Sequence, residues 1–559
     1  MLLKSLIVIT IFLSTLSGRE ITLKEIDGYP RSIAKDFYIW QFLKQNSTTA
    51  KEAEKAYSQI KRKSQKVEKE YIKKVKRVPK VVIDKCKNIP VKDIPTHKDL
   101  KCVANSLTPV KAILLKPAQQ KNLINKLKSV DKDKELLLKA LYYAQPIEKT
   151  LYSKPEIYFD LFFWGTKNFR EGERVNRDLN YGFINRLTVD KRRFTKFVRK
   201  ILAYKVYAPL KKALLKVDPT DKIETDTLFD LAFHLIANGH IDKAKRFFRV
   251  AEKSSYYQPH KDRAVFWLYL ITKSGKYLSQ LDRSWDINIY TLYAKEKLGK
   301  PVDNVLSHYN FSDYDPLFKP KMNPSSPFDW HETKKEIFRL QKNEKAEDNL
   351  LNFANLFKTS EHIGVHSYIM ERAMMFKKQS FPMPYSDVLE DLSIEDRAMI
   401  YSLARQESRF IPGSISISFA LGMMQIMPFL VEDIAKRKGE KIELEDMFNP
   451  RKNLEYAKFH LKDLKRQFKS PLFIAYAYNG GGGFTRRLLK NGDFFEKGKY
   501  EPFLSMERVW YRESRLYGKK VLANYIIYSK LLNRPASIHQ LLDEVLIPEK
   551  SDYVRKTKK

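Results

Sequence analysis

A succession of short helical patterns, each ended by a turn residue, restricts this chain to an α-helical fold. In residues 228–237 (LFDLAFHLIA) the apolar residues recur at the spacing of one helix face. Asn238 and Gly239 then supply a turn, and residues 241–251 (IDKAKRFFRVA) repeat the helical pattern. Because short amphipathic helices bury their apolar faces by packing on one another, this segment predicts a helix-turn-helix unit.

The same arrangement recurs further along the chain. Residues 263–272 (RAVFWLYLIT) and 286–298 form the next pair, and Gly275 and Gly299 are expected to break helices there. Stacked pairs of this kind build a solenoid. No strict repeat length is present, so we expect an irregular superhelix over residues 19–300 rather than a regular tetratricopeptide array.

Proline-rich stretches divide the rest of the chain. Four prolines between Pro316 and Pro327 mark residues 301–379 as a linker that continues into further helices. Two more prolines, in the stretch FPMPYSD, open the last part of the chain. The sequence therefore predicts an all-α protein with an α-superhelical domain, a linker helical domain over 301–379 and a final domain over 380–559.

The N-terminus has the pattern of a secretory signal. Lys4 supplies a positive charge, residues 6–13 are apolar, and small residues follow up to Gly18. The apolar run is shorter than the roughly 20 residues of a spanning helix, which makes a membrane anchor the less favoured alternative. We expect residues 1–18 to be a signal peptide and the mature chain to be periplasmic, at most peripheral to the membrane.

The chain has two cysteines, Cys86 and Cys102, separated by 16 positions. In an exported protein such a pair is more often a disulfide than two free thiols. We therefore treat the pair as a candidate disulfide. Two cysteines do not by themselves suggest a structural zinc site, and neither a metal nor a cofactor is expected.

A formal net charge of +38 would concentrate polyanions near the surface. That excess fits nucleic acid as well as an anionic cell wall. An exported chain does not normally meet the genome, and its basic residues are not interleaved with a recognition motif, so no nucleic-acid partner is expected. The alternative is a basic character spread over solvated helix faces without any specific partner.

One acidic residue, Glu407, lies where a catalytic acid is expected. The stretch 398–410 (AMIYSLARQESRF) has an apolar stripe at helical spacing, and Glu407 continues that stripe. A carboxyl group that faces a core without a charged partner tends to stay protonated, which suits a general acid. The alternative is a structural glutamate bound by backbone or by Arg405 or Arg409.

The next motif, residues 422–428 (GMMQIMP), is a turn that starts at a glycine and ends where Pro428 begins a helix. Its amide, Gln425, has a donor and an acceptor that fit a sugar hydroxyl or an N-acetyl group. The methionines fit either a pocket wall or the core, and for Met424 alone the core is favoured.

A third motif ends a short helix. Residues 471–479 (PLFIAYAYN) are helical in pattern, and four glycines at 480–483 are expected to end this helix. Tyr478 and Asn479 then lie at a helix C-terminus, where the backbone can approach a ligand closely.

The order of these pieces resembles the soluble lytic murein transglycosylases, whose catalytic domain is of the goose-type lysozyme kind. The successive motifs are QES at 406–408, GMMQIMP at 422–428 and AYNGG at 477–481. A fourth stretch, 513–522 (ESRLYGKKVL), is similar to the family's ETR-x-Y-x-K-x-VL element. The resemblance spans roughly residues 382–532 and implies a lysozyme-like α fold for the last domain.

The chain departs from the family pattern beside these motifs. Phe419 and Leu421 occupy a loop that usually holds small residues, Met423 stands in place of a leucine, and Trp510 in place of a proline. These changes surround the expected pocket, so they bear on substrate preference more than on the chemistry.

The resemblance implies a lyase of peptidoglycan turnover that cleaves the β-1,4 bond between N-acetylmuramic acid and N-acetylglucosamine. Glu407 is the expected catalytic residue, first as the acid for the glycosidic oxygen and then as the base for the 6-hydroxyl, which closes a 1,6-anhydro ring. Glycoside cleavage usually needs a second carboxylate, and here the substrate's N-acetyl oxygen takes its place. Glycan strands are the expected partner, and other proteins of cell-wall synthesis or hydrolysis are candidate partners.

The same resemblance implies a set of substrate-binding residues. Ser416 and Gln425 would bind the sugar and its N-acetyl group, Tyr478 would steady the reacting ring, and Glu513 would contact the muramic acid or its peptide. Glu507 is the main alternative to Glu513. The full set is Ser416, Met424, Gln425, Met427, Tyr478, Asn479 and Glu513.

Other functions stay open on the sequence alone. A goose-type lysozyme would hydrolyse the same bond and leave reducing ends. A non-catalytic peptidoglycan-binding scaffold would use the solenoid to recruit partners. A secreted nucleic-acid binder is disfavoured by the expected export.

Overall fold

The structure is a computed structural model that describes residues 19–75, 86, 89–309 and 322–555. The expected signal peptide at residues 1–18 lies outside the described residues. Regular structure in the described chain is almost entirely helical, with one short parallel pair of strands, which confirms the all-α fold class. Contacts group the chain into two compact units, and each unit is described by itself.

The first unit contains residues 19–75, 303–309, 322–478 and 524–536 of the described chain. The helix α26 (Pro471–Gly480) contributes its residues up to Tyr478, and α29 (Arg512–Leu531) those from Asn524. Its other elements are α1 (Leu23–Gly28), α2 (Ile33–Lys44), α3 (Ala50–Ser58), α4 (Gln65–Val75), β1 (Val305–Leu306), α20 (Pro327–Leu340), α21 (Ala346–Asn355), α22 (Ile363–Ala373), β2 (Gln379–Ser380), η4 (Ser386–Leu389), α23 (Ile394–Glu407), α24 (Pro428–Lys438), η5 (Leu444–Phe448) and α25 (Pro450–Lys465).

The second unit contains residues 86, 89–302, 479–523 and 537–555 of the described chain. Its first elements are η1 (Ile94–Thr96), α5 (Leu100–Ser106), α6 (Pro109–Leu114), α7 (Pro117–Leu127), α8 (Lys132–Tyr142), α9 (Ile147–Leu151), α10 (Pro155–Trp164), α11 (Lys167–Glu171), α12 (Tyr181–Arg186), η2 (Leu187–Val189), α13 (Lys191–Ala203), η3 (Lys205–Tyr207), α14 (Ala208–Leu214), α15 (Thr225–Ala237), α16 (Ile241–Ser254), α17 (Gln258–Thr272), α18 (Gly275–Asp282) and α19 (Ile289–Lys297). Later elements are α27 (Gly482–Lys490), α28 (Phe503–Arg508), α30 (Ile538–Glu544) and α31 (Pro548–Ser551).

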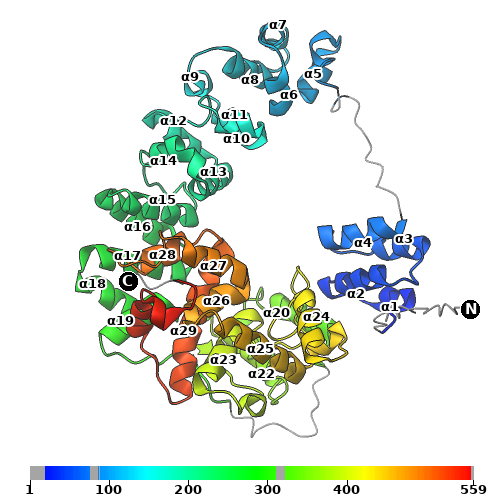
Figure 1. Cartoon of the computed structure of the whole chain (residues 1–559), viewed down its shortest axis with the longest axis vertical. Helices are drawn as coiled ribbons and strands as arrows, with labels where there is room; N and C mark the ends of the chain where they lie inside the picture. Colours follow the sequence, from blue (N-terminus) through cyan, green and yellow to red (C-terminus); the bar gives the residue numbers. More distant parts are fainter. Residues whose placement is uncertain (1–18, 76–85, 87–88, 310–321, 556–559) are drawn as a thin grey trace, which may run out of the picture. The chain divides into compact units, whose positions relative to one another are not determined.

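Within the second unit, successive helices stack on one another, as Figure 1 shows for α15 to α19. The first predicted helix pair corresponds to α15 and α16, and Gly239 lies in the turn between them at φ 81°. This stacking confirms a helical superhelix. The domain boundaries expected from the sequence stay a prediction.

Gly275 does not break a helix, contrary to expectation. The preceding helix α17 ends because Lys273 adopts the left-handed conformation at φ 57°, and Gly275 is the first residue of α18. The sequence pattern missed α18 because the turn uses a lysine in a conformation that usually favours glycine or asparagine.

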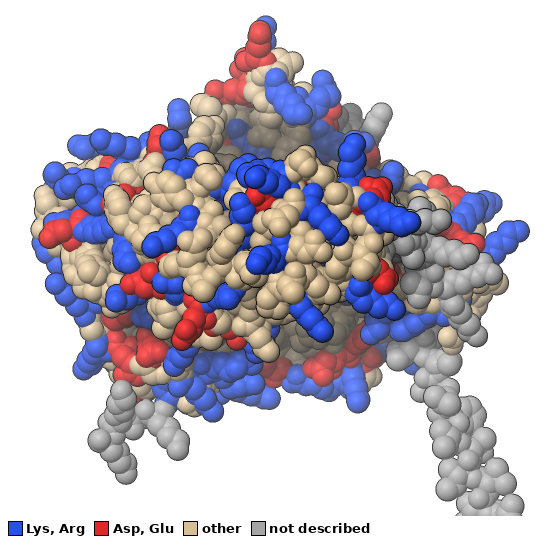
Figure 2. Space-filling view, turned by 90° about the horizontal axis from the view of Figure 1, so that it is seen from above, with Lys and Arg blue, Asp and Glu red and all other residues tan. Residues whose placement is uncertain are grey.

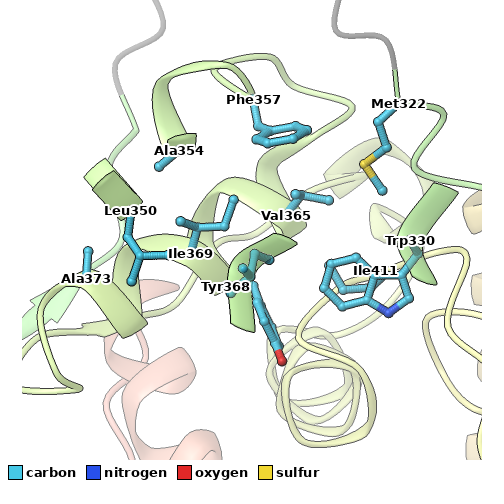
Figure 3. Close-up of a cluster of buried hydrophobic side chains, with 11 residues drawn as sticks. Met322, Trp330, Leu350, Ala354, Phe357, Val365, Tyr368, Ile369, Ala373 and Ile411 are labelled. Atoms are coloured by element: carbon cyan, nitrogen blue, oxygen red, sulfur yellow. The ribbon is translucent and has the colours of Figure 1, made fainter. Parts of the chain in front are cut away.

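A hydrophobic core of the first unit lies where α20, α21 and α22 pack together (Figure 3). Trp330, Leu350 and Ile369 are buried in it, and Ile411 joins them from the chain that follows α23. This core therefore anchors the segment directly after Glu407.

The N-terminal helices belong to the first unit, and in Figure 1 α2 lies beside the elements around α24. Phe37 of α2 packs edge-on against Phe419 and Phe448, with ring centroids 5.7 and 6.4 Å away. Residues from the start of the chain thus support the loop that carries the second motif.

Basic residues are distributed widely over the surface. Figure 2 shows Lys and Arg across the visible face with Asp and Glu among them. In the second unit, Cys86 and Cys102 are joined by a disulfide with an S–S distance of 1.99 Å. None of the helices in the described ranges combines the length and apolarity needed to cross a bilayer.

Candidate active site

Glu407 is the last residue of α23, which begins where the Ser393 hydroxyl accepts a hydrogen bond from the Asp396 N–H at 3.2 Å. The helix ends because the next residues leave helical geometry. Arg409 and Phe410 both have positive φ, 60° and 64°, so the chain turns sharply away from the helix axis. Glu407 is half-buried at this turn.

Ser408 fastens this turn to the second motif. Its hydroxyl donates a hydrogen bond to the Met423 carbonyl at 2.7 Å and accepts one from the Ile411 N–H at 3.0 Å. The end of α23 and the GMMQIMP loop are therefore held together beside Glu407.

The two arginines next to Glu407 in sequence converge on a different acid. Arg405 Nη2 and Arg409 Nη1 each lie 2.9 Å from Oε1 of Glu371, which is on α22. The side chain of Glu371 is only 1% exposed, and its Oε1 also accepts the Ser380 N–H at 2.8 Å. Arg405 and Arg409 therefore form their ion pairs with Glu371, whereas the alternative interpretation expected one of them to bind Glu407.

The loop that contains the second motif is folded tightly. Leu421 makes antiparallel bridges with Ile415 and Ile426. Gly422 has φ 75°, and a Cβ placed there would lie 2.1 Å from the Met447 carbonyl oxygen, so only glycine fits. Asn453 of α25 then holds the loop, accepting the Met424 N–H at 2.7 Å.

Gln425 lies at the tip of this loop and is half-buried. Its φ of 50° is left-handed, and its Nε2 donates to the carbonyls of Ser414 and Gly422 at 3.1 and 2.7 Å. Within the described residues no hydrogen bond reaches its Oε1. The two hydrogen bonds therefore fix the orientation of the side-chain amide, and its Oε1 can accept a hydrogen bond from a ligand.

Ser416 lies on the same loop. Its hydroxyl oxygen accepts the N–H groups of Ser418 and Ala420 at 3.2 and 2.9 Å. Pro428 begins α24 as expected, with Met427 as its half-buried N-cap residue. Met424 is fully buried, at 0% exposure, as the core interpretation favours.

Tyr478 reaches the same loop from α26. Its hydroxyl donates a hydrogen bond to the Met424 carbonyl at 2.8 Å. Burial, and then the negative charge of Glu407, raise the pKa of Tyr478 well above its ordinary value. His460 packs against the Tyr478 ring at a centroid distance of 5.3 Å, and burial lowers the pKa of His460 to about 4.

The structure thus brings three sequence motifs together in the first unit. The end of α23 contacts the loop through Ser408, the loop contacts α26 through Met424 and Tyr478, and the charge of Glu407 acts on the phenol of Tyr478. An acid, a fixed amide and a neutral phenol side by side can donate and accept protons around a polar ligand.

Phe419, which departs from the family pattern, packs the loop that carries the second motif against helix α2. Its ring packs against Phe37 at 5.7 Å and Trp40 at 5.5 Å, both on α2. Lys66 of α4 adds a hydrogen bond to the Ser418 carbonyl at 3.1 Å. The bulky residue at this position is therefore explained by packing against the N-terminal helices.

Asn479 and Glu513 meet in the second unit. The Ser514 hydroxyl donates to Asn479 Oδ1 at 2.7 Å, and Asn479 Nδ2 lies 3.4 Å from Oε1 of the exposed Glu513. A Cβ at Gly480 would lie 2.6 Å from the Ser514 hydroxyl and 2.7 Å from the Phe484 ring, so a larger residue would have to displace these side chains.

Only one of the four glycines at 480–483, Gly481, ends helix α26, whereas the sequence predicted that the whole run would do so. Gly480 is still helical, Gly481 breaks the helix at φ 85°, and Gly482 already begins α27. Two helices thus follow one another almost without a loop, because one left-handed glycine is enough to redirect the chain.

Glu507, the main alternative to Glu513, has a different environment. Its side chain is 1% exposed and bonded to Arg263, Lys519 and, through a 2.6 Å hydrogen bond, the hydroxyl of Tyr290. Burial opposes ionisation, but the charges of Arg263 and Lys519 hold the pKa of Glu507 well below its usual range. Glu507 is thus fully engaged inside the second unit.

Sequence reasoning missed three residues that shape the site, namely Glu371, Asn453 as the clamp of the loop, and His460. Glu371 lies in a segment without any motif. Asn453 and His460 lie in residues 449–464, a stretch that resembles the family's helix between the second and third motifs, but this resemblance gave neither residue a role. No group of three or more potential metal ligands occurs in the part of the chain that the structure describes.

Comparisons with known proteins find sequence relatives of the segment that contains these motifs. The sequence model of the family described as "Transglycosylase SLT domain" matches residues 391–500. The soluble lytic murein transglycosylase of Salmonella typhimurium is 27% identical over 177 residues, which cover 29% of this chain and 25% of that protein. The membrane-bound lytic murein transglycosylase C of Actinobacillus succinogenes is 30% identical over 107 residues, 17% of this chain and 30% of that protein.

A solved structure of the lytic transglycosylase Slt of Pseudomonas aeruginosa aligns over 94% of this chain and 81% of that chain, with 13% identity and a TM-score of 0.44. The sequence matches span about a third or less of the length of the curated relatives. The matched segment contains Glu407, Gln425 and Tyr478. Residues 391–500 of this chain are therefore similar in sequence to the family described as "Transglycosylase SLT domain".

Proposed function

We propose that this protein is an exported lytic murein transglycosylase that cleaves the β-1,4 bond between N-acetylmuramic acid and N-acetylglucosamine and leaves a 1,6-anhydromuramic acid end. The observation that carries the proposal is the position of Glu407, half-buried at the end of α23 and electrostatically coupled to the buried phenol of Tyr478. The family match over the same segment supports it.

Glu407 is the proposed acid and base. As the acid it gives its proton to the glycosidic oxygen while the bond from that oxygen to the anomeric carbon breaks. The N-acetyl oxygen of the substrate closes on the anomeric carbon. Glu407, now a carboxylate, takes the proton of the 6-hydroxyl, whose oxygen then attacks the anomeric carbon and displaces the N-acetyl oxygen. No water is consumed.

A mechanism with a single acid is consistent with the surrounding carboxylates. Glu371 is bound by two arginines and is 1% exposed, so it is not placed to act as a second nucleophile. A retaining glycosidase with two carboxylates would need such a partner about 5 Å from the acid. The substrate's own N-acetyl group can fill that role.

The geometry of Gln425 and Tyr478 supports the binding roles that we propose for them. Gln425 has its Nε2 engaged by two carbonyls, so its Oε1 is oriented to accept from an N-acetyl N–H or a hydroxyl. Tyr478 stays neutral because of its raised pKa and presents a fixed phenol. We assign Ser416, Met427, Asn479 and Glu513 to substrate binding as well, and Met424 to the support of the pocket wall.

The proposed location is the periplasm, after removal of a signal peptide, with peptidoglycan glycan strands as the partner. The basic surface in Figure 2 suits an anionic wall polymer. Other proteins of cell-wall synthesis or hydrolysis are candidate partners.

The test is muropeptide analysis of purified sacculi digested by the mature chain. Mass spectrometry should find anhydromuramic ends, which are lighter than reducing ends by one water. Glu407→Gln should slow their release by about 100-fold or more, as expected for loss of a general acid. Glu361→Gln makes the same change at an exposed position of the first unit and serves as the matched control.

Two results would reject the proposal. Reducing ends in place of anhydro ends would indicate a goose-type lysozyme activity. Release by wild type, Glu407→Gln and Glu361→Gln that does not exceed the release from sacculi without protein would indicate a protein that does not cut the wall.

A further inference from the structure

The second unit contains a cavity that none of the candidate site residues lines. Its volume is about 730 Å³, and it lies between the helices α13, α14 and α15 and the segment 491–515. Cavities that enclose small ligands typically have volumes of about 300–1,000 Å³. The cavity is therefore large enough for a ligand of disaccharide size.

The lining of this cavity is strongly basic. It includes seven lysines and arginines and three carboxylates. Two of the carboxylates are already neutralised, since Asp230 pairs with Arg515 at 3.2 Å and Glu507 pairs with Arg263 at 2.5 Å. The wall thus carries an excess of positive charge.

Three of these cations are not neutralised by an ion pair with any described residue. Lys205, Lys211 and Arg508 line the cavity, and none of them has an acidic ion-pair partner among the described residues. Lys211 is half-buried, and its pKa is lowered first by burial and then by the positive charges of Arg508 and Lys205. Like charges gathered in a hollow whose acidic residues do not pair with them oppose folding, which points to a ligand that supplies the missing negative charge.

Aromatic side chains complete the wall. Trp510 is 46% exposed and rests with its edge on Phe494 at a centroid distance of 5.6 Å. It occupies the position where the chain departs from the family's proline. The flat face of an indole packs against apolar faces such as that of a sugar ring, while arginine and lysine bind carboxylates.

We propose that this cavity is a second binding site, which takes an anionic saccharide with its carboxylates on Lys205, Lys211 and Arg508 and a sugar ring on Trp510. The chemistry of the ligand follows from the cavity alone. Its identification as a peptidoglycan fragment, a disaccharide that carries a stem peptide, rests on the proposed function.

The experiment is calorimetric titration of the full mature chain carrying Glu407→Gln with three probes. These are the N-acetylglucosaminyl-N-acetylmuramyl tetrapeptide, neutral chitobiose and inorganic phosphate. Lys211→Gln combined with Arg508→Gln should weaken binding of the tetrapeptide probe by about tenfold or more for each lost cation. Lys297→Gln combined with Lys300→Gln removes the same charge from exposed positions outside the cavity and should change nothing.

A second pair of variants separates the two sites. Gln425→Ala disturbs the candidate active site but not the cavity, so binding sensitive to Lys211 and Arg508 should persist in it. Trp510→Ala should weaken the tetrapeptide probe and leave phosphate unaffected.

The proposal is overturned if the Lys211 and Arg508 variant binds like its control, or if chitobiose or phosphate binds as tightly as the tetrapeptide probe. Cleavage of sacculi by the chain with native Glu407 is measured in parallel. If cleavage is normal but the chain shows no binding that depends on Lys211 and Arg508, only the cavity proposal is rejected. If that binding is present but the chain with native Glu407 does not cleave sacculi, only the proposed function is rejected.

Discussion

Removal of the buried charge of Glu507 tests whether this residue is structural. Glu507→Gln keeps the shape of the side chain but leaves Arg263, 4% exposed, and Lys519, 8% exposed, without their carboxylate. The wild-type carboxylate lies 2.5 Å from Arg263 and 2.7 Å from Lys519. Breaking such a buried pair typically costs about 3–5 kcal/mol.

The lower end of that range applies here for a physical reason. Burial lowers the pKa of Lys519, so in the variant this lysine can release its proton and relieve part of the buried positive charge. We therefore expect the free energy of local unfolding around Glu507 to fall by about 3 kcal/mol. This corresponds to roughly hundredfold faster hydrogen exchange.

Hydrogen exchange followed by mass spectrometry measures this opening in peptides from α17 and α28, which carry Arg263 and Glu507. Glu513→Gln is the matched control, since that side chain is exposed and its contact with Asn479 is 3.4 Å long. The double variant Arg263→Met with Glu507→Gln should lose less stability than the sum of the losses in the two single variants, because the two residues contact each other. Unchanged exchange in Glu507→Gln, or full additivity in the double variant, would refute the reasoning.

Two further predictions concern the first unit. Phe419→Ala removes the contacts with Phe37 and Trp40, so we expect faster hydrogen exchange in residues 413–427. Murein cleavage should be about 10- to 100-fold slower, because the loop with Gln425 loses its support. Phe338→Ala, at a position that is 45% exposed, is the control. His460, whose pKa is lowered to about 4, stays neutral in the folded chain while the unfolded chain takes up a proton below pH 6.5, so stability should fall between pH 6.5 and 4 by about 1.4 kcal/mol per unit. Thermal unfolding of His460→Gln should lack this component; an identical pH profile would contradict the assignment.

The local elements of the fold could be predicted from the sequence to a large extent. The pair α15 and α16 and the start of α24 at Pro428 follow from helical periodicity and from turn and cap residues. The start of α18 did not, because the preceding turn uses Lys273 at positive φ. A turn of that kind has no compositional signal.

Long-range contacts were beyond the reach of sequence patterns. The motifs named Glu407, Gln425 and Tyr478, but nothing in them indicated that Glu371 would hold both neighbouring arginines. Periodicity places a residue on a helix face, whereas the partner across that face depends on how distant helices pack. The support of Phe419 by α2 was hidden for the same reason.

The contact of Phe419 with α2 has a consequence for the order in which the protein matures. During synthesis the N-terminal end emerges first, and the loop with Gln425 follows only after most of the chain. A partly synthesised chain therefore contains α2 but still lacks the loop that α2 supports. A proteolytic fragment that begins after α2 contains the loop without the helix that supports it, so the proposed cleavage activity should require α2 and the loop in the same chain.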